Sequence, residues 1–329
     1  MTSTAKAAVH TVGDAAEEPG SRPGAVRPYL DDLPLELWEA DERPAPAPRR
    51  RRRRPGWNTV LPVVVALALV GALVFVVPLG EDEGGSRPGG APAEPEVSSL
   101  ASIGDNPLLR RGTNLPDVRC DLPGVRADHG ALHRFYSAEL RCLDRAWEPA
   151  LTGAGLDFER VTVDVADDPD TACGALPPPE RATGLYCAED ATIYLPRQRT
   201  LDAFGLSDEA HLATLAHEYG HHVQHLSGIL SDANGQLNRY PAGSPPDREL
   251  GRRVELQANC FAGAFFSSAS GRGSITDGLA DDSVDDFRNW VDSDTHGTSD
   301  TQREWALRGY RQGDVGTCNT WHAASADVT

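Results

Sequence analysis

Positive charge is scarce in the larger part of this 329-residue sequence. The first 58 residues hold ten basic and nine acidic side chains, which leaves 21 basic and 40 acidic side chains for the rest of the chain. An acidic surface of this kind repels phosphate groups, so we expect no nucleic acid as a partner of that part. Methionine occurs only as Met1, and only one long stretch of the chain is apolar and uncharged. The chain therefore has room for a single membrane span at most.

That apolar stretch covers residues 60–79, VLPVVVALALVGALVFVVPL. Its length matches the roughly 20 residues that a helix needs to cross a hydrocarbon core about 30 Å thick. Six consecutive arginines, residues 49–54, precede it and GEDEGG follows it. The positive-inside rule then predicts a cytoplasmic tail over 1–58, a transmembrane helix over 59–79, and an extracytoplasmic location for the rest. We expect a single-pass protein of the cell membrane and interpret the arginine run as its topology signal.

The composition on either side of the apolar stretch indicates three further segments. Residues 1–58 are too polar and proline-rich to bury a core, which predicts disorder. Residues 80–104, rich in Gly, Pro and Ser, indicate a flexible linker, and residues 105–329 a globular extracytoplasmic domain. All six cysteines lie in that domain, in a compartment that permits disulfides. We expect Cys173 to pair with Cys187 around a short Pro-rich loop, and also expect the pairs Cys120–Cys142 and Cys260–Cys318.

Periodicity within the domain favours an α+β fold that is mostly helical with a small sheet. Apolar residues follow helical spacing from His133 to a terminating glycine. Residues 158–167 alternate as a strand does, and the segment 191–198 indicates a second short strand, at a sheet edge because Pro196 follows it. Helices are predicted from Ser207 to Gly228, from Asp247 onward, and after a cap at Ser299.

The helix from Ser207 carries the segment LAHEYGHHVQ, residues 215–224. His217 and His221 are four residues apart, so they present two imidazoles on one side of the helix. This HExxH spacing suits zinc, and the intervening Glu218 can reach a water molecule bound to the metal and act as general base. HExxH alone can arise by chance, so the interpretation requires a third ligand and an open coordination position.

The following helix offers that third ligand. Glu255 lies on it together with Asn259, four residues further, and a carboxylate ligand oriented by a neighbouring amide is a sensible pair. Asp232 is an alternative ligand, but it lies in a Gly/Asn-rich segment that we interpret as a loop. The extended HExxHxxGxxH pattern is excluded, because positions 224 and 227 are Gln224 and Ser227 and no methionine is available for a Met-turn.

Three further histidines stand near these motifs. His222 points about 100° away from His221, and His225 lies at the fringe of the predicted metal side, near the end of the helix. We interpret both as structural or surface residues. His296 precedes the helix after Ser299. It is a candidate catalytic residue that donates a hydrogen bond to the tetrahedral intermediate, and a packed loop histidine is the alternative.

Four blocks in order, CGALPPPERATGLYCAEDATIYL, LAHEYGHHVQ, VELQANCFAG and HGTSDTQREWALRGYRQGDVGTC, resemble the neutral zinc metallopeptidases of bacteria, a single-spanning membrane family related to the gluzincins. The resemblance covers about residues 106–322. It implies a zincin-like fold, Zn²⁺ bound by His217, His221 and Glu255, and Glu218 as catalytic base. One position departs from the family pattern, because Asn259 stands where relatives have an acidic residue.

These observations predict a membrane-anchored zinc endopeptidase that hydrolyses peptide bonds in a protein or peptide substrate. An extended substrate can pair with the strand at Thr192 to Leu195. A second hypothesis keeps the zinc without the reaction, as a zinc-stabilised extracytoplasmic receptor or scaffold. A third, a binding module in which the histidines of the helix are coincidental, predicts no stoichiometric zinc.

Overall fold

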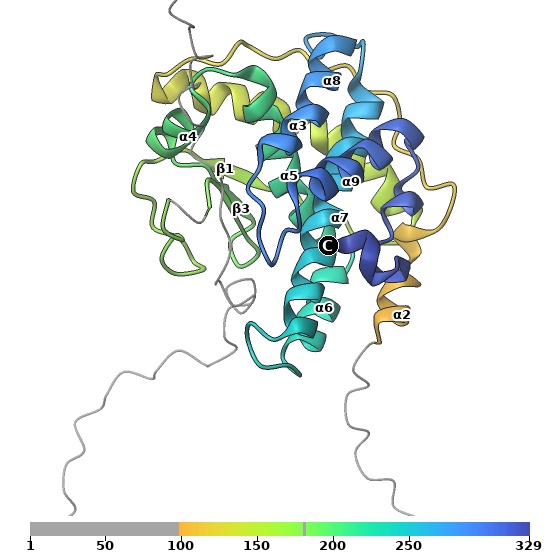
Figure 1. Ribbon diagram of the computed structural model, residues 1–329. Helices are drawn as coiled ribbons and strands as arrows, with labels where there is room; N and C mark the ends of the chain where they lie inside the picture. The colour runs from red at the N-terminus through yellow and green to blue at the C-terminus, as the bar shows by residue number, and fades with distance from the viewer. Residues whose placement is uncertain (1–98, 180–181) are drawn as a thin grey trace, which may run out of the picture. The chain divides into compact units, whose positions relative to one another are not determined.

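A computed structural model describes residues 99–179 and 182–329 (Figure 1). The predicted tail, membrane helix and most of the predicted linker lie outside these residues. Within them, no helix combines the length and the apolar character that a membrane span requires. The last residues of the predicted linker form the short helix α2, in which Ile103 is buried, so the folded domain begins before residue 105.

The domain is mostly helical and contains one three-stranded sheet, as predicted (Figure 1). Its elements in chain order are α2 (Leu100–Gly104), η3 (Pro107–Leu109), α3 (His129–Gly153), β1 (Thr162–Asp164), β2 (Leu185–Cys187), β3 (Thr192–Tyr194), α4 (Arg197–Phe204), α5 (Asp208–Leu226), α6 (Ile229–Leu237), α7 (Pro245–Ala269), α8 (Asp277–Asp286), η4 (Phe287–Asn289), α9 (Ser299–Gln312), η5 (Val315–Cys318), η6 (Thr320–His322) and η7 (Ser325–Val328).

Helix α7 lies at the centre of the domain and packs against both α5 and α9. Its contact with α9 brings the two backbones together, because a Cβ atom on Gly263 would lie 1.9 Å from the Ala306 carbonyl oxygen. Gly309 on α9 faces α7 in the same way, with the Cys260 carbonyl oxygen 2.0 Å from the position of a Cβ. Only glycine permits so close an approach.

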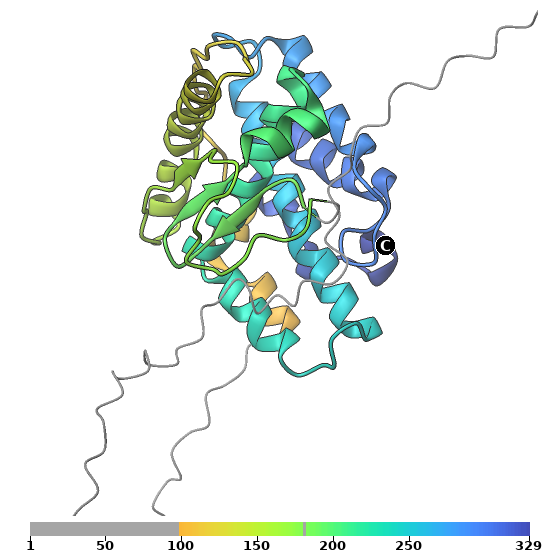
Figure 2. The same ribbon diagram turned by 90° about the vertical axis from the view of Figure 1, so that its left-hand side faces the viewer.

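The sheet lies on the other side of α5 from α9, and Figure 2 shows it facing the viewer. Its strand order is β1–β3–β2, with β1 parallel and β2 antiparallel to β3. Val163 and Tyr186 both stand opposite Ile193, which is fully buried. The prediction of an edge strand at residues 191–198 was therefore wrong. Pro196 follows the last paired residue, so it removes no hydrogen bond from the ladder.

Helix α3 begins at His129, four residues before the predicted start, because the Asp128 side chain accepts a hydrogen bond from the Ala131 N–H. It packs on the core through Trp147, whose ring meets that of Phe261 with centroids 5.2 Å apart.

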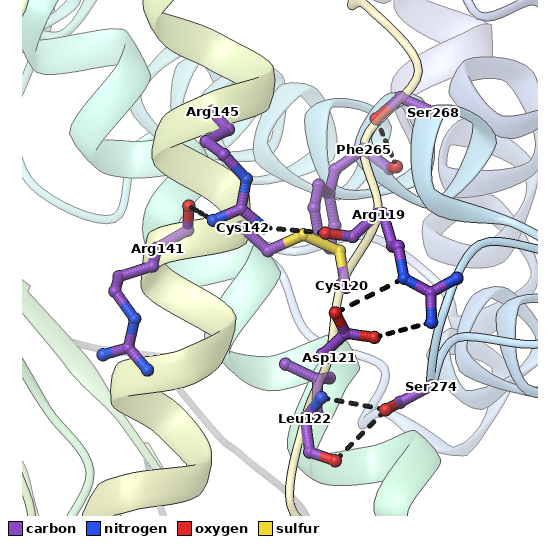
Figure 3. Close-up of a disulfide and its surroundings, with 10 residues drawn as sticks. All are labelled: Arg119, Cys120, Asp121, Leu122, Arg141, Cys142, Arg145, Phe265, Ser268 and Ser274. Atoms are coloured by element: carbon purple, nitrogen blue, oxygen red, sulfur yellow. Dashed lines mark hydrogen bonds and ion pairs between the residues drawn. A yellow bond between two sulfur atoms is a disulfide. The ribbon is translucent and has the colours of Figure 1, made fainter.

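A disulfide fixes the preceding segment to α3 (Figure 3). Cys120 is joined to Cys142, and Arg145 on the same helix donates a hydrogen bond to the Arg119 carbonyl at 2.8 Å. On the other side, Ser274 accepts from the Leu122 N–H and donates to its carbonyl. The extended segment is thereby held between α3 and the turn after α7.

The two remaining disulfides are Cys173–Cys187 and Cys260–Cys318, so all three predicted pairings are confirmed. The second of these links α7 to the C-terminal 3-10 segments. Two local predictions need correction. The cap of α9 is Thr298, one residue before the predicted Ser299, and Asp232 lies in helix α6 and not in a loop.

Candidate metal centre

Helix α5 presents the HExxH motif toward the interior. The Ser207 side chain caps the helix by accepting a hydrogen bond from the Ala210 N–H at 3.2 Å, and Asp208 and Glu209 occupy its first turn. These acidic groups interact favourably with the partial positive charge of the helix start. His217 and His221 are almost completely buried, with exposed fractions of 3% and 1%.

Gly220, inside the HExxH motif, decides where α7 crosses α5. A Cβ atom at this position would lie 2.9 Å from both the Cα and the carbonyl oxygen of Ala258. Because Gly220 has no side chain, the two backbones can come into contact at Ala258. Glu255, one turn earlier on α7, then faces the two imidazoles on α5.

Three ligand atoms meet at this crossing. The Nε2 atoms of His217 and His221 are 3.0 Å apart, and each lies 3.3 Å from Glu255 Oε2. Tetrahedral ligands about 2.1 Å from zinc are separated by about 3.4 Å, so the three distances fit a shared ion. These residues form a group whose ligand atoms can hold one metal. The structure thus brings together the three predicted ligands, and Asp232 is not among them.

The chemistry of the donors also fits a cation. Glu255 Oε2 is buried and accepts no hydrogen bond of normal geometry among the described residues. An uncompensated carboxylate oxygen is expensive to bury. Burial by itself would raise the pKa of Glu255, but the positive potential of His221 and His296 outweighs it and holds this pKa well below its usual range. Burial lowers the pKa of His217 to about 4, which keeps its imidazole neutral at pH 7.

Side-chain amides fix the other nitrogen of each imidazole. His217 Nδ1 lies 2.7 Å from Asn259 Oδ1, and His221 Nδ1 lies 2.9 Å from Gln224 Oε1. Since an amide oxygen only accepts, each Nδ1 carries a proton, and in its neutral form each imidazole has its lone pair on Nε2, toward the centre. Asn259 therefore orients His217. The prediction from its spacing on α7, that it orients Glu255, was wrong.

Glu218 lies beside the centre in a narrow space. A Cβ atom on Gly184 would be 2.8 Å from Glu218 Oε1, and the Tyr186 N–H donates a hydrogen bond to the Glu218 carboxylate. Burial raises the pKa of Glu218 to about 7, although His221 opposes the shift. A carboxyl group with this pKa can both take up and release a proton near neutral pH.

His296 reaches the centre from the loop before α9. Its Nε2 lies 3.3 Å from Glu255 Oε2, and its Nδ1 lies 3.1 Å from the hydroxyl oxygens of Ser293 and Thr295. Hydroxyl groups can donate to Nδ1, which leaves Nε2 free to carry a proton.

Two arginines of α7 hold the His296 loop in place. Arg248 pairs with the Asp294 carboxylate at 2.5 Å, and Arg252 donates to the Asp294 carbonyl at 2.6 Å. The loop is thus attached to the same helix that carries Glu255.

The other two histidines lie away from the centre, as predicted. His222 is buried between the Tyr186 hydroxyl, 3.0 Å from its Nδ1, and the Glu159 carbonyl, 2.8 Å from its Nε2. His225 is exposed at the end of α5. Sequence reasoning missed Trp290, whose ring packs edge-on against that of His217 with centroids 4.9 Å apart. It lies outside every predicted helix and strand, so no pattern marked it.

Comparison with known proteins agrees with this geometry. A family model described as "Putative neutral zinc metallopeptidase" matches residues 125–321. An uncharacterised protein of Mycobacterium bovis is 32% identical over 211 residues, an alignment that covers 55% of this chain and 68% of that protein. The uncharacterised protein YpfJ of Escherichia coli is 35% identical over 157 residues, which cover 42% of this chain and 53% of YpfJ. No solved structure matched the chain. Since the family model spans more than half of the sequence, the chain belongs to this zinc metallopeptidase family.

Proposed function

We propose that this protein is a zinc endopeptidase that hydrolyses peptide bonds in protein or peptide substrates. The observation that carries the proposal is the convergence of His217, His221 and Glu255 on one point, with Glu218 beside it. In this proposal the three converging residues hold Zn²⁺ through two nitrogen atoms and one oxygen atom. Three protein ligands would leave a coordination position for water, as in catalytic zinc sites.

When bound there, zinc supplies Lewis acidity toward the substrate carbonyl and makes water a better nucleophile. Glu218 accepts the proton of the attacking water and passes it to the leaving amine. Its raised pKa and its hydrogen bond from the Tyr186 N–H support both parts of that role. His296 donates a hydrogen bond from Nε2 to the substrate oxygen as negative charge develops on it. The hydroxyl groups of Ser293 and Thr295 support this role by holding Nδ1 as an acceptor.

The strand that we expected to pair with substrate does not suit that purpose. Strand β3 already pairs with β1 on one side and with β2 on the other. Both of its edges are therefore occupied, and the proposal assigns it no contact with substrate backbone.

Replacing Glu218 by Gln tests the mechanism. The amide keeps the shape of the side chain but cannot take a proton, so cleavage of an unstructured protein should fall by about 10²–10⁴-fold while zinc content stays at one per chain. Glu209→Gln, on the first turn of the same helix, is the matched control and should cleave normally. Unchanged cleavage by Glu218→Gln would show that another group is the base.

A second candidate function, a zinc-stabilised receptor or scaffold, is supported by the neutral amides behind both histidines. Asn259 and Gln224 donate less electron density to an imidazole than a carboxylate does. Stoichiometric zinc without turnover of any of a varied set of peptides would favour this function. Loss of folding on chelation would then mark the metal as structural.

We further propose that residues 59–79 anchor the protein in the cell membrane with the zinc domain outside. The supporting observations are the apolar run and the preceding arginines in the sequence, together with three disulfides in the folded domain. Reporter proteins fused to each end of the chain test this topology. A cytoplasmic signal from the C-terminal fusion would contradict it.

A further inference from the structure

We infer that Gln224 and Gln257 are positioning residues that form a relay and impose the metal-binding tautomer on His221. The inference deepens the proposed function, because it rests on the proposed zinc site. It assigns a role to two buried glutamines on different helices and to the C-terminal segment that contacts one of them.

The relay is a continuous chain of hydrogen bonds. It starts at His221 Nδ1, which lies 2.9 Å from Gln224 Oε1. Gln224 Nε2 donates to the Val254 carbonyl at 2.8 Å and to Gln257 Oε1 at 3.0 Å. Gln257 Nε2 in turn donates to the Cys318 carbonyl at 3.1 Å.

Groups that can only donate or only accept fix which way each amide of this hydrogen-bond chain is oriented. The Trp321 indole N–H can only donate, and it lies 3.4 Å from Gln257 Oε1. The Val254 and Cys318 carbonyls can only accept. Turning the Gln257 amide over would place its NH₂ group against two donors and its oxygen against a carbonyl. Each glutamine therefore has one satisfied orientation, in which Gln224 presents its oxygen to His221.

The consequence for His221 follows from that oxygen. Nδ1 must carry a proton, so in the neutral imidazole the lone pair lies on Nε2, which is 3.3 Å from Glu255 Oε2. The other tautomer would place an N–H in the centre and a lone pair against the oxygen of Gln224. Both glutamines are fully buried, so water does not compete for these bonds.

The relay joins segments that are distant in the sequence. Gln224 lies on α5 and Gln257 on α7, and the Cys260–Cys318 disulfide holds the carbonyl that accepts the last bond. His217 is held by one amide only, because Asn259 Nδ2 is buried and has no hydrogen-bond partner within residues 99–179 and 182–329. The two zinc ligands thus differ in how firmly their tautomer is imposed.

Zinc affinity of the full chain, measured by competition with a chelator, tests the relay. Gln224→Leu should weaken zinc binding by about 10–100-fold, and Gln257→Leu, which touches no ligand, by about tenfold. Gln236→Leu, the same change at a buried glutamine of α6 outside the relay, should leave the affinity unchanged. Gln257→Met replaces Gln257→Leu if the latter does not fold. Nitrogen NMR of the histidine rings in zinc-free protein, recorded at a pH where His221 is neutral, should show its proton on Nδ1, and a mixture of the two tautomers in Gln257→Leu.

The double variant decides whether the two glutamines act in series. If Gln257 acts through Gln224, the double variant binds zinc no more weakly than Gln224→Leu alone. Additive losses would overturn the relay, as would a Gln257→Leu protein that binds zinc like Gln236→Leu. Absence of zinc binding in the unaltered chain would instead refute the proposed function itself.

Discussion

The amide at position 259 gives the sharpest quantitative prediction. Asn259 Oδ1 accepts a hydrogen bond from His217 Nδ1 at 2.7 Å, while its Nδ2 is buried with no hydrogen-bond partner in the part of the chain that the structure describes. Asn259→Asp keeps an acceptor at the same place and removes the unpaired donor. It also turns a neutral hydrogen bond into a charge-assisted one, which is about twice as strong.

The expected gain in zinc affinity follows from the strength of this hydrogen bond. A neutral hydrogen bond contributes about 1 kcal/mol net, so the charge should strengthen the hold on zinc-bound His217 by about 1–2 kcal/mol. That corresponds to about 5–30-fold higher zinc affinity. Without zinc the effect reverses, because a second buried carboxylate one turn from Glu255 repels it. The zinc-free Asn259→Asp protein should therefore melt at a lower temperature than the unaltered protein.

Two measurements check this prediction. Chelator competition gives the zinc affinity, and thermal melting with and without zinc gives the stability of each form. Asn259→Ala is the companion variant and should bind zinc about 10–100-fold more weakly. If Asn259→Asp folds and binds zinc no more tightly than the unaltered protein, the hydrogen bond to His217 does not control the affinity of the site.

Three other changes test the packing and the buried charge. Gly220→Ala should lower the free energy of unfolding by about 1–3 kcal/mol and weaken zinc binding, because its Cβ would clash with α7; Gly278→Ala, with open space at its Cβ, should show no loss in the same melts. Burial raises the pKa of Glu139 well above its usual value, and neither of its carboxyl oxygens has a hydrogen-bond partner among the residues that the structure describes. The folded state therefore holds this proton more tightly than the unfolded state, so the contribution of Glu139 to stability is largest below its unfolded pKa and falls by about 1.4 kcal/mol per pH unit between its unfolded and folded pKa. Urea unfolding from pH 4 to 8 should show that this slope is smaller in Glu139→Gln, and an unchanged slope would assign it to other groups. Replacing Cys260 and Cys318 by Ala opens a link across 58 residues, which the chain-entropy model values at about 4 kcal/mol; equal midpoints in urea would contradict that value.

The elements that carry the centre were predictable because their signals are local. The periodicity around His217 and Glu255 spans several turns, and the caps and spacing lie within single helices. The cysteine pairs could be proposed from their order along the chain. The long helices and the three candidate ligands therefore came from the sequence with little error.

The parts that escaped prediction depend on contacts between distant segments. Strand β2 is only Leu185–Cys187, too short to show alternation, so no pattern marked the second partner of β3, and Pro196 alone suggested an edge. Asn259 shares a side of α7 with Glu255, but its partner His217 arrives from another helix. The bond from Gln224 to Gln257 likewise spans 33 residues and leaves no mark on either helix alone.

The glycine contacts of α7 with α5 and α9 mean that the imidazoles and carboxylates of the centre are brought together during folding. Both neighbours touch the α7 backbone directly, and α9 follows immediately after the loop that holds His296. Helices in such contact cannot slide or rotate without steric overlap. The imidazoles and carboxylates are consequently aligned once the chain has folded, and under the proposed function an arriving peptide would have only to place its own carbonyl among them.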